Sequence, residues 1–206
     1  MANAVFRGYD DKMINKPRKD NVPADLLRRL ISYNPDTGKM LWLPRPVEMF
    51  SSAGNSAKAN QSTWNNRWAG APALNSPHKD HLAGRIFSKL YLAHRAAWAI
   101  QTGEWPEFEI DHIDHNGRNN KWENLREVTH AENAKNIKLP NHNTSGRIGV
   151  SWDSRGKQWE SYITVNRKRK FLGYFSDFGD ATDARLAAEI ENGFHKNHGA
   201  MKYGRH

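Results

Sequence analysis

The chain contains no cysteine, and this absence limits the kinds of metal site that it can build. With no cysteine among 206 residues, disulfide bonds and thiolate zinc sites are excluded, so any metal must be held by oxygen atoms or imidazoles. Long apolar runs are also missing. The chain has no stretch of about 18 apolar residues, the length that could cross a membrane. Its first residues also lack the apolar core of a signal peptide. We therefore expect a soluble, cytoplasmic protein without membrane contact.

Acidic residues are in the minority, and the charges are unevenly distributed. The chain has 31 lysines and arginines against 22 aspartates and glutamates, a formal net charge of +9. Residues 1–88 carry +6, residues 89–140 carry −1 and residues 141–206 carry +4. Basic flanks around an acidic centre suit a polyanion that is held on both sides, with a cation in the middle. The plainer alternative is that the basic charge serves only solubility.

The residues suited to catalysis are concentrated in residues 108–136. Asp111 and His112 stand side by side at the end of a short apolar-alternating run, and the polar loop HNGRNN follows. Residues 125–128 are expected to form a second short strand, from Leu125 to Val128. This pattern predicts two strands joined by a loop.

A helix is expected to follow the second strand. Thr129 and Glu132 are three residues apart, which is the spacing of a capping box, in which each side chain satisfies a backbone donor of the other residue. Asn133 then falls in the first turn of this helix. The stretch therefore predicts the order strand, loop, strand, helix.

The order and spacing of these residues resemble the HNH endonucleases of the homing type, in the branch whose motif reads H-N-N. The resemblance implies a ββα-metal fold in which Asp111 and Asn133 hold one divalent cation, Mg²⁺ or alternatively Mn²⁺. It implies that His112 is the general base and that Asn124 braces the loop. The segment that contains His94 also resembles the one that precedes the Asp-His pair in this branch, so His94 lies either near the site or packed in the core.

The chemistry of phosphodiester hydrolysis explains these residue types independently of the family. The leaving alkoxide is poor and the substrate is anionic, so the reaction needs a base to prepare water and a cation to take up charge. A hard cation such as Mg²⁺ prefers oxygen ligands and commonly uses only one or two carboxylates. One aspartate and one asparagine carbonyl fit such a site.

A second Asp-His pair, Asp114 and His115, follows the first, and Asn136 lies at the matching distance beyond it. Spacing alone does not choose between the two sets. We favour the first set, because Ile110 and Ile113 flank the first pair as strand residues. His115 is instead followed by Asn-Gly, a strong turn signal. The second pair is therefore predicted to lie in a loop.

The pattern changes beyond residue 140. Three short strands are expected within residues 149–175, with turns at 154–156 and 166–167, and a helix is expected at about residues 180–192, ending at Gly193. Residues 145–199 resemble the APETALA/ERF-type DNA-binding domain, in which a three-stranded sheet enters the major groove and a helix backs it. The matching features are SGRIGVSW, Trp159, FLGYF and the alanine-rich helix.

This second resemblance and the local cations together suggest where DNA would be contacted. Plant members place arginines on the first strand where this chain has Ile148 and Ser151, so their base preferences are not expected here. The candidate nucleic-acid contacts are Arg147, Trp152, Arg155, Arg167, Lys168, Arg169 and Lys170.

The remaining segments give simpler expectations. Residues 1–20 are predicted to be a flexible basic arm whose Lys12, Lys16, Arg18 and Lys19 could contact phosphate, although a disordered tail fits equally well. Helices are expected at residues 26–31 and 92–101, the second ending at Gly103, and two short strands around a turn are expected at residues 33–42. Residues 51–63 show no periodicity and are predicted to form a loop.

The sequence thus predicts an α+β protein with a basic arm (1–20), an HNH nuclease domain (21–140, core motif 108–137) and a DNA-binding domain (141–206). The expected function is metal-dependent hydrolysis of phosphodiester bonds in double-stranded DNA, with no protein partner implied. A non-catalytic DNA-binding regulator that uses the HNH fold as scaffold is the alternative. An RNA-binding protein or ribonuclease is disfavoured, because the usual single-strand aromatic motifs are absent.

Overall fold

The chain forms a mixed α+β structure in a computed structural model that describes residues 22–52 and 54–200. The predicted basic arm at residues 1–20 lies outside the described residues. The contacts divide the chain into two compact units. Unit 1 comprises residues 22–112 and Asn116–Glu127, and unit 2 comprises Ile113–His115 and residues 128–200. None of the described helices has the length and apolar content that a bilayer span requires.

Unit 1 begins with α2 (Ala24–Leu30), whose N-cap is Pro23. Its Leu27 and Leu30 are completely buried and form the centre of the core. The antiparallel strands β1 (Ile31–Tyr33) and β2 (Met40–Trp42) follow. The predicted helix and the predicted pair of strands are confirmed, except that Ile31 belongs to β1 rather than to the helix.

The prediction of a loop over residues 51–63 is wrong. After the short 3-10 helix η1 (Val47–Met49), the helix α3 (Ala57–Trp68) covers the second half of this segment and continues beyond it. The side chain of Ser56 caps the helix by accepting a hydrogen bond from the backbone N–H of Ala59 at 3.2 Å. No residue of α3 is buried, so its sequence carries no apolar stripe, and an apolar stripe is the signal that reveals most helices.

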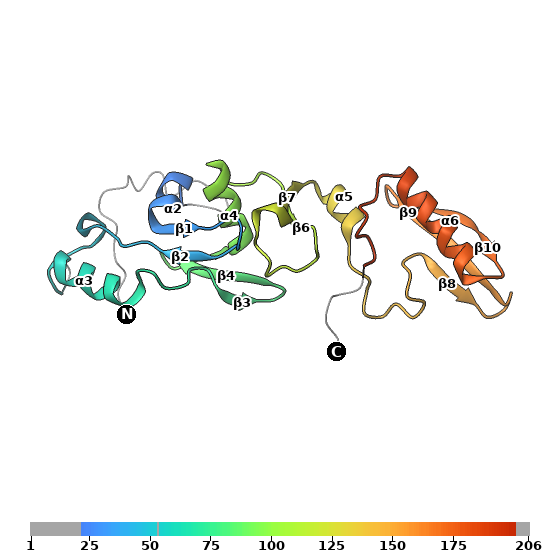
Figure 1. Cartoon of the computed structure of the whole chain (residues 1–206), viewed down its shortest axis with the longest axis horizontal. Coiled ribbons are helices and arrows are strands. Elements are labelled where there is room, and N and C mark those ends of the chain that lie inside the picture. The colour runs from blue at the N-terminus through green and yellow to red at the C-terminus, as the bar shows by residue number, and fades with distance from the viewer. Residues whose placement is uncertain (1–21, 53, 201–206) are drawn as a thin grey trace. The chain divides into compact units, whose positions relative to one another are not determined.

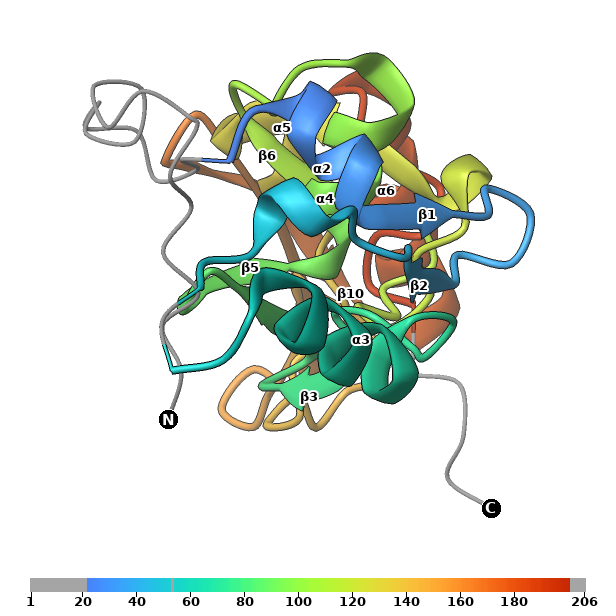
Figure 2. The same ribbon diagram turned by 90° about the vertical axis from the view of Figure 1, so that its left-hand side faces the viewer.

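Polar contacts and a stacked arginine hold α3 on the outside of unit 1, where it faces the viewer in Figure 2. Gln61 and Asn65 each donate a side-chain hydrogen bond of 3.0 Å to the backbone oxygen of Arg45. The guanidinium of Arg45 lies 3.9 Å from the ring centre of Trp64, and burial lowers the pKa of Arg45 to about 10. Trp64 also meets the rings of Trp42 and Phe50, with ring centres 5.9 and 6.4 Å apart, so Arg45 and these aromatic contacts together attach α3.

A three-stranded antiparallel sheet and the helix after it complete the framework of unit 1 (Figure 1). The strands are β3 (Ser76–His78), β4 (His81–Ile86) and β5 (Lys89–Leu92), and α4 (Ala93–Thr102) follows β5 directly. Ala96 and Ala97 of α4 are completely buried, which lets the helix pack closely against the core. Gly103 ends α4 with a left-handed φ of 93°, so the predicted helix end is confirmed.

The stretch that carries the motif forms β6 (Glu109–His112), the 3-10 helix η2 (Trp122–Asn124) and β7 (Leu125–Val128). β6 and β7 pair in a two-stranded sheet. The short helices α5 (His130–Asn133) and η3 (Ala134–Asn136) follow, and both bonds of the Thr129–Glu132 capping box are present. The predicted order of strand, loop, strand and helix is confirmed.

Unit 2 contains a three-stranded antiparallel sheet with the order β10-β9-β8 and one helix. The strands are β8 (Val150–Asp153), β9 (Gln158–Val165) and β10 (Lys168–Phe175), and the helix is α6 (Phe178–Glu191). α6 lies along one face of the sheet (Figure 1), where Phe178 meets Trp159 with ring centres 4.7 Å apart. These elements match the predicted strands and helix.

The backbone of residues 135–139 is joined to the end of unit 2. Lys135 and Ile137 accept backbone hydrogen bonds from His195 and Gly199, and Leu139 donates one to Ala200. These bonds place residues 128–140 in unit 2, whereas the sequence suggested a boundary at residue 141. The division into an HNH domain and a DNA-binding domain at that residue stays a prediction.

Candidate active site around His112

Asp111 and His112 are the last two residues of β6, and both are buried, with 8% and 4% of their surface exposed. Ile110 anchors the strand in the core of unit 1. Successive side chains of a strand point to opposite faces, so Asp111 and His112 meet different neighbours. Ile113, which was expected to continue the strand, lies in a turn instead, because the chain reverses direction here and His115 adopts a positive φ of 60°.

Asp111 is held by an arginine from the neighbouring strand β7. Its Oδ2 accepts hydrogen bonds from Nε of Arg126 at 2.9 Å and from Nη2 at 2.7 Å. A buried carboxylate is stable only when its charge is compensated, and the guanidinium provides this compensation. The same negative charge makes Asp111 suitable for attracting a cation.

The ring of His112 is oriented by Asn120. Nε2 of His112 lies 3.1 Å from Oδ1 of Asn120, which is itself only 2% exposed. An amide oxygen can only accept a hydrogen bond, so Nε2 of the neutral ring carries the proton and Nδ1 carries the lone pair. The backbone oxygen of Asn120 accepts a hydrogen bond of 2.8 Å from the hydroxyl of Tyr33, whose pKa burial raises to about 12.

The loop between the two strands is supported from two sides. Asn124 donates from Nδ2 to the backbone oxygen of Asn119 at 2.8 Å, which is the contact expected of a residue that braces the loop. On the other side, Trp122 donates its backbone N–H to the oxygen of Pro35 in the β1–β2 turn at 2.9 Å. Gly38 of this turn has a φ of 71°, and a Cβ on it would lie 2.5 Å from the carbonyl carbon of Asn120. The turn therefore needs glycine to approach the loop this closely.

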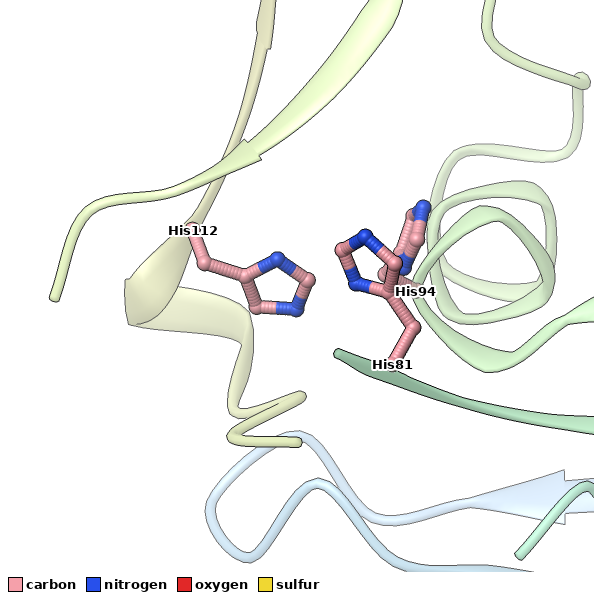
Figure 3. A group of neighbouring side chains, drawn as sticks. All are labelled: His81, His94 and His112. Carbon is pink, nitrogen blue, oxygen red and sulfur yellow. The ribbon is translucent and has the colours of Figure 1, made fainter. Parts of the chain in front are cut away.

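Three histidines from three different elements meet at this point (Figure 3). The ring centres of His81 (β4) and His94 (α4) are 4.7 Å apart, and those of His94 and His112 (β6) are 5.0 Å apart. The centres of His81 and His112 are 5.5 Å apart. One nitrogen of each ring lies within 4.8 Å of the other two. His94 is therefore both a buried core residue and a neighbour of His112, so both sequence expectations for it hold.

His94 is a neutral imidazole at physiological pH. Burial, and to a smaller extent the positive charge that His112, His81 or Arg95 can carry, lowers its pKa to about 3. Only 4% of its surface is exposed. A protonated ring at this place would be desolvated and would face other cations, so the fold keeps His94 uncharged.

Gly117 of the HNGRNN loop lets the backbone of the loop pack closely against Asp80 and His81. A Cβ on Gly117 would lie 2.4 Å from the backbone oxygen of Asp80 and 2.5 Å from Nδ1 of His81. Such distances exclude any side chain at this position unless the neighbours move. The glycine thus joins the loop to the start of β4.

The second Asp-His pair lies in a turn, as predicted from the Asn-Gly that follows it. Nε2 of His115 is 2.9 Å from Oδ1 of Asn136, and Asn136 is 3% exposed. Both residues belong to unit 2. The pair joins the turn to η3, which gives His115 and Asn136 a structural function.

Asn133 lies on α5 in unit 2, where its backbone N–H donates to the oxygen of Thr129 at 2.9 Å. The type of donor atom fits a hard divalent cation, since Asp111 offers a carboxylate and Asn133 offers an amide oxygen. The assignment of both residues to one cation stays a prediction, as do the catalytic roles of His112 and Asn124.

The strand register of unit 2 separates the predicted DNA contacts onto two faces of the sheet. Lys170 is opposite Ile163, which is completely buried, so Lys168 and Lys170 lie on the side that α6 covers. Arg169 is opposite Thr164 and lies on the other side, which we call the open face. The three cations therefore alternate between the two faces of the sheet.

The open face carries an arginine among aromatic rings. The guanidinium of Arg169 lies 3.8 Å from the ring centre of Tyr162 and pairs with Glu160 at 2.7 Å. Phe171 and Tyr174 are 52% and 54% exposed, and their ring centres are 5.0 Å apart. The open face therefore includes Glu160, Tyr162, Thr164, Arg169, Phe171 and Tyr174.

The other candidate contacts lie in different surroundings. Arg155 and Arg167 are exposed in the two turns that connect the strands. Arg147 pairs with the buried Glu189, and Trp152 packs against Trp159 with ring centres 5.2 Å apart. Arg147 and Trp152 thus serve packing within unit 2, and DNA contact by any of the four stays a prediction.

Sequence reasoning did not identify Arg126, Asn120 or His81 as site residues. Arg126 could have been predicted from the local sequence, because a charged residue in a short strand often pairs with an opposite charge on the neighbouring strand. Asn120 is the last residue of the polar loop, but nothing in the sequence pairs it with His112. His81 could not be found locally, because only the fold brings β4 beside β6.

Comparison with known proteins gives two matches. The HNH endonuclease family matches residues 91–135, which run from β5 through α5. Protein 3.8 of Escherichia phage T7 is 37% identical over 84 residues, which cover 40% of this chain and 69% of the T7 protein. No solved structure is significantly similar to the chain.

Proposed function

Because this chain belongs to the family of phage protein 3.8 and contains an HNH endonuclease domain, we propose that it is a metal-dependent endonuclease that hydrolyses phosphodiester bonds in double-stranded DNA. The observation that carries the proposal is the buried pair at the end of β6. Within the matched segment, Asp111 is charge-paired and the ring of His112 is held in one orientation.

His112 acts as the general base in this proposal. Its hydrogen bond to Asn120 keeps the proton on Nε2, so Nδ1 has the lone pair that accepts a proton from the attacking water. Asn120 is a positioning residue, because it acts on water only through the ring of His112. The buried surroundings also limit rotation of the ring, which keeps the base in a productive orientation.

Asp111 and Asn133 are the proposed holders of one divalent cation, Mg²⁺ or Mn²⁺. When bound, the cation supplies Lewis-acid stabilisation of the negative charge on the phosphate and on the leaving oxygen. Arg126 stays close to Asp111 and limits the repulsion between this carboxylate and the approaching phosphate. Asn124 keeps the HNGRNN loop in place through Asn119.

We further propose that the sheet of unit 2 binds the DNA duplex, as the resemblance to the APETALA/ERF-type domain implies. The three-stranded sheet with a helix on one face supports this proposal. On the open face Arg169 can reach phosphate or a base edge, and the exposed turn arginines Arg155 and Arg167 extend the basic surface.

The test of catalysis is cleavage of supercoiled plasmid by purified protein with Mg²⁺ and with a chelator. We expect wild-type protein to cut only with the divalent cation. His112→Ala should lower the rate by roughly 10²- to 10⁴-fold, the usual contribution of a positioned base, while DNA affinity changes little.

His115→Ala is the matched control, since it removes the histidine of the second Asp-His pair. A large loss of rate in His115→Ala with a normal rate in His112→Ala would overturn the assignment of the base. Metal-independent cleavage by wild type would contradict the role of the cation. DNA binding without any cleavage would favour a non-catalytic regulator.

A further inference from the structure

The three rings of His81, His94 and His112 have the spacing of ligands around a single metal ion. Zn–N bonds of about 2.0–2.1 Å in a tetrahedral site place imidazole centres about 5 Å apart. The centres measured here are 4.7, 5.0 and 5.5 Å apart. One nitrogen of each ring lies within 4.8 Å of the other two, and the three nitrogens must move closer together to bind a common ion.

Two of these rings also have buried nitrogen atoms without a hydrogen bond. Within the described part of the chain, Nδ1 of His81 and Nδ1 of His94 find no hydrogen-bond partner. His94 is 4% exposed. Leaving a buried polar atom unsatisfied is destabilising, so the packing of these histidines is unfavourable unless something binds them. A metal ion would satisfy one nitrogen on each ring.

The chemistry of the ligands decides which metal fits. Imidazole suits the borderline ions Zn²⁺, Cu²⁺, Ni²⁺ and Co²⁺, whereas Mg²⁺ prefers oxygen. A group of three imidazoles therefore discriminates against the hard cation that the proposed reaction uses. The two kinds of ion would go to different donor sets, an oxygen set and an imidazole set.

We propose that His81, His94 and His112 form a binding site for a borderline transition-metal ion such as Zn²⁺, and that occupancy of this site inhibits DNA cleavage. The inhibitory part rests on the proposed function of His112 as general base. A ring nitrogen that donates its lone pair to a metal cannot accept a proton from water. The enzyme would then be active when Mg²⁺ is abundant and zinc is scarce.

Direct measurement of metal binding tests the site without any assay of activity. Tag-free, metal-free full-length protein is dialysed against Zn²⁺, and the bound metal is quantified. Wild type should bind Zn²⁺ through this site. His81→Gln and His94→Gln should bind it at least about tenfold more weakly, because each variant removes one of three ligands.

His142→Gln is the matched control, since it removes an exposed histidine of unit 2 that has no part in the cluster. Its affinity for Zn²⁺ should equal that of wild type. His81 is the preferred test position, because it is only partly buried and glutamine keeps a polar side chain there. Equal affinity in His81→Gln and wild type would overturn the site.

Inhibition is measured as the Mg²⁺-supported cleavage rate at increasing concentrations of Zn²⁺. We expect the wild-type rate to fall as the site fills and to recover when a Zn²⁺-selective chelator is added. For His81→Gln, measured relative to its own rate without zinc, the inhibiting concentration should rise at least about tenfold. Zinc that binds without slowing cleavage, or that accelerates it, would overturn the inhibitory part.

The two measurements separate failure of this inference from failure of the proposed function. If wild type binds Zn²⁺ through these histidines but shows no Mg²⁺-dependent cleavage, the nuclease assignment is wrong and the metal site stands. If cleavage occurs normally and no Zn²⁺ binds, the metal site is wrong and the nuclease assignment stands.

Discussion

Arg126 and Asp111 are joined by two hydrogen bonds to a single carboxylate oxygen, from Nε at 2.9 Å and from Nη2 at 2.7 Å. The two side chains come from neighbouring strands, so the pair also ties β6 to β7. A cation that uses Asp111 must share this carboxylate with the guanidinium. Under the proposal that Asp111 holds a cation, Arg126 therefore sets both the stability of this carboxylate and its readiness to accept metal.

Replacing Arg126 should make these two effects visible. Arg126→Ala removes both guanidinium hydrogen bonds from the buried carboxylate, so we expect the free energy of unfolding to fall by about 1–3 kcal/mol. Because the carboxylate then has no guanidinium beside it, Mg²⁺ should raise the melting temperature of the variant more than that of wild type. Arg118→Ala, in the exposed part of the loop, is the control. An equal effect of Mg²⁺ on the two variants and wild type would contradict this account of Arg126.

The stability of the metal-free protein should depend on pH through His94. Its pKa is lowered to about 3 in the folded chain, whereas the unfolded value is about 6.5. Below pH 6.5 the unfolded chain therefore binds a proton that the folded chain does not, and stability falls as the pH decreases toward 3. Above pH 6.5 both states are neutral and His94 contributes no pH dependence.

His94→Gln removes this titration and provides the comparison. Between pH 6.5 and 5, the stability of wild type relative to the variant should decrease by about 2 kcal/mol, since each pH unit contributes about 1.4 kcal/mol. Urea unfolding in the presence of a chelator measures this difference. If the difference in free energy of unfolding between wild type and His94→Gln stays constant over this range, His94 is protonated in the folded protein.

In unit 2 the ion pairs around Glu189 should be necessary for folding. Glu189 is 5% exposed and pairs with Arg185 at 2.8 Å and with Arg147. Removing one partner of a buried charge cluster typically costs about 3–5 kcal/mol, so Glu189→Ala should unfold residues 128–200 far more easily. Hydrogen exchange measured by mass spectrometry locates the effect. Glu191→Ala, at an exposed position of the same helix, should change little.

The two faces of the sheet should contribute differently to DNA binding. If Arg169 contacts phosphate from the open face, Arg169→Ala lowers the slope of log K against log salt by about 0.9. Lys170 lies on the side that α6 covers, so Lys170→Ala should leave this slope nearly unchanged. A salt titration of duplex binding by the full chain measures both. An equal decrease of the salt slope in Arg169→Ala and Lys170→Ala would mean that the duplex is not bound through the open face.

Most of the fold could be predicted from local patterns. The capping box at Thr129, the left-handed Gly103 and the turn signal at residues 166–167 each satisfy a local backbone requirement, so the elements that they bound were predicted correctly. The helix α3 was missed because none of its residues is buried and its contacts are made by single side chains to residues outside it, such as Arg45 and Trp42. No periodicity in α3 itself reports such an attachment.

The site could be predicted only where its residues follow one another along the chain. The position of Asp111 and His112 at the end of β6 was predicted from the local pattern, whereas their burial was not. The ring of His112 also meets His81 and Asn120, and these contacts depend on how β4 and the loop approach β6 in space. No spacing in the sequence encodes that approach.

The way in which α3 is attached has a consequence for how such proteins can diverge. A helix that places no side chain in the core can be lost, lengthened or exchanged without leaving a cavity. Arg45 is the exception, because its guanidinium is stacked on Trp64 and its backbone is bonded to Gln61 and Asn65. Relatives that lack the helix should therefore also have replaced this arginine, and the two changes should occur together across the family.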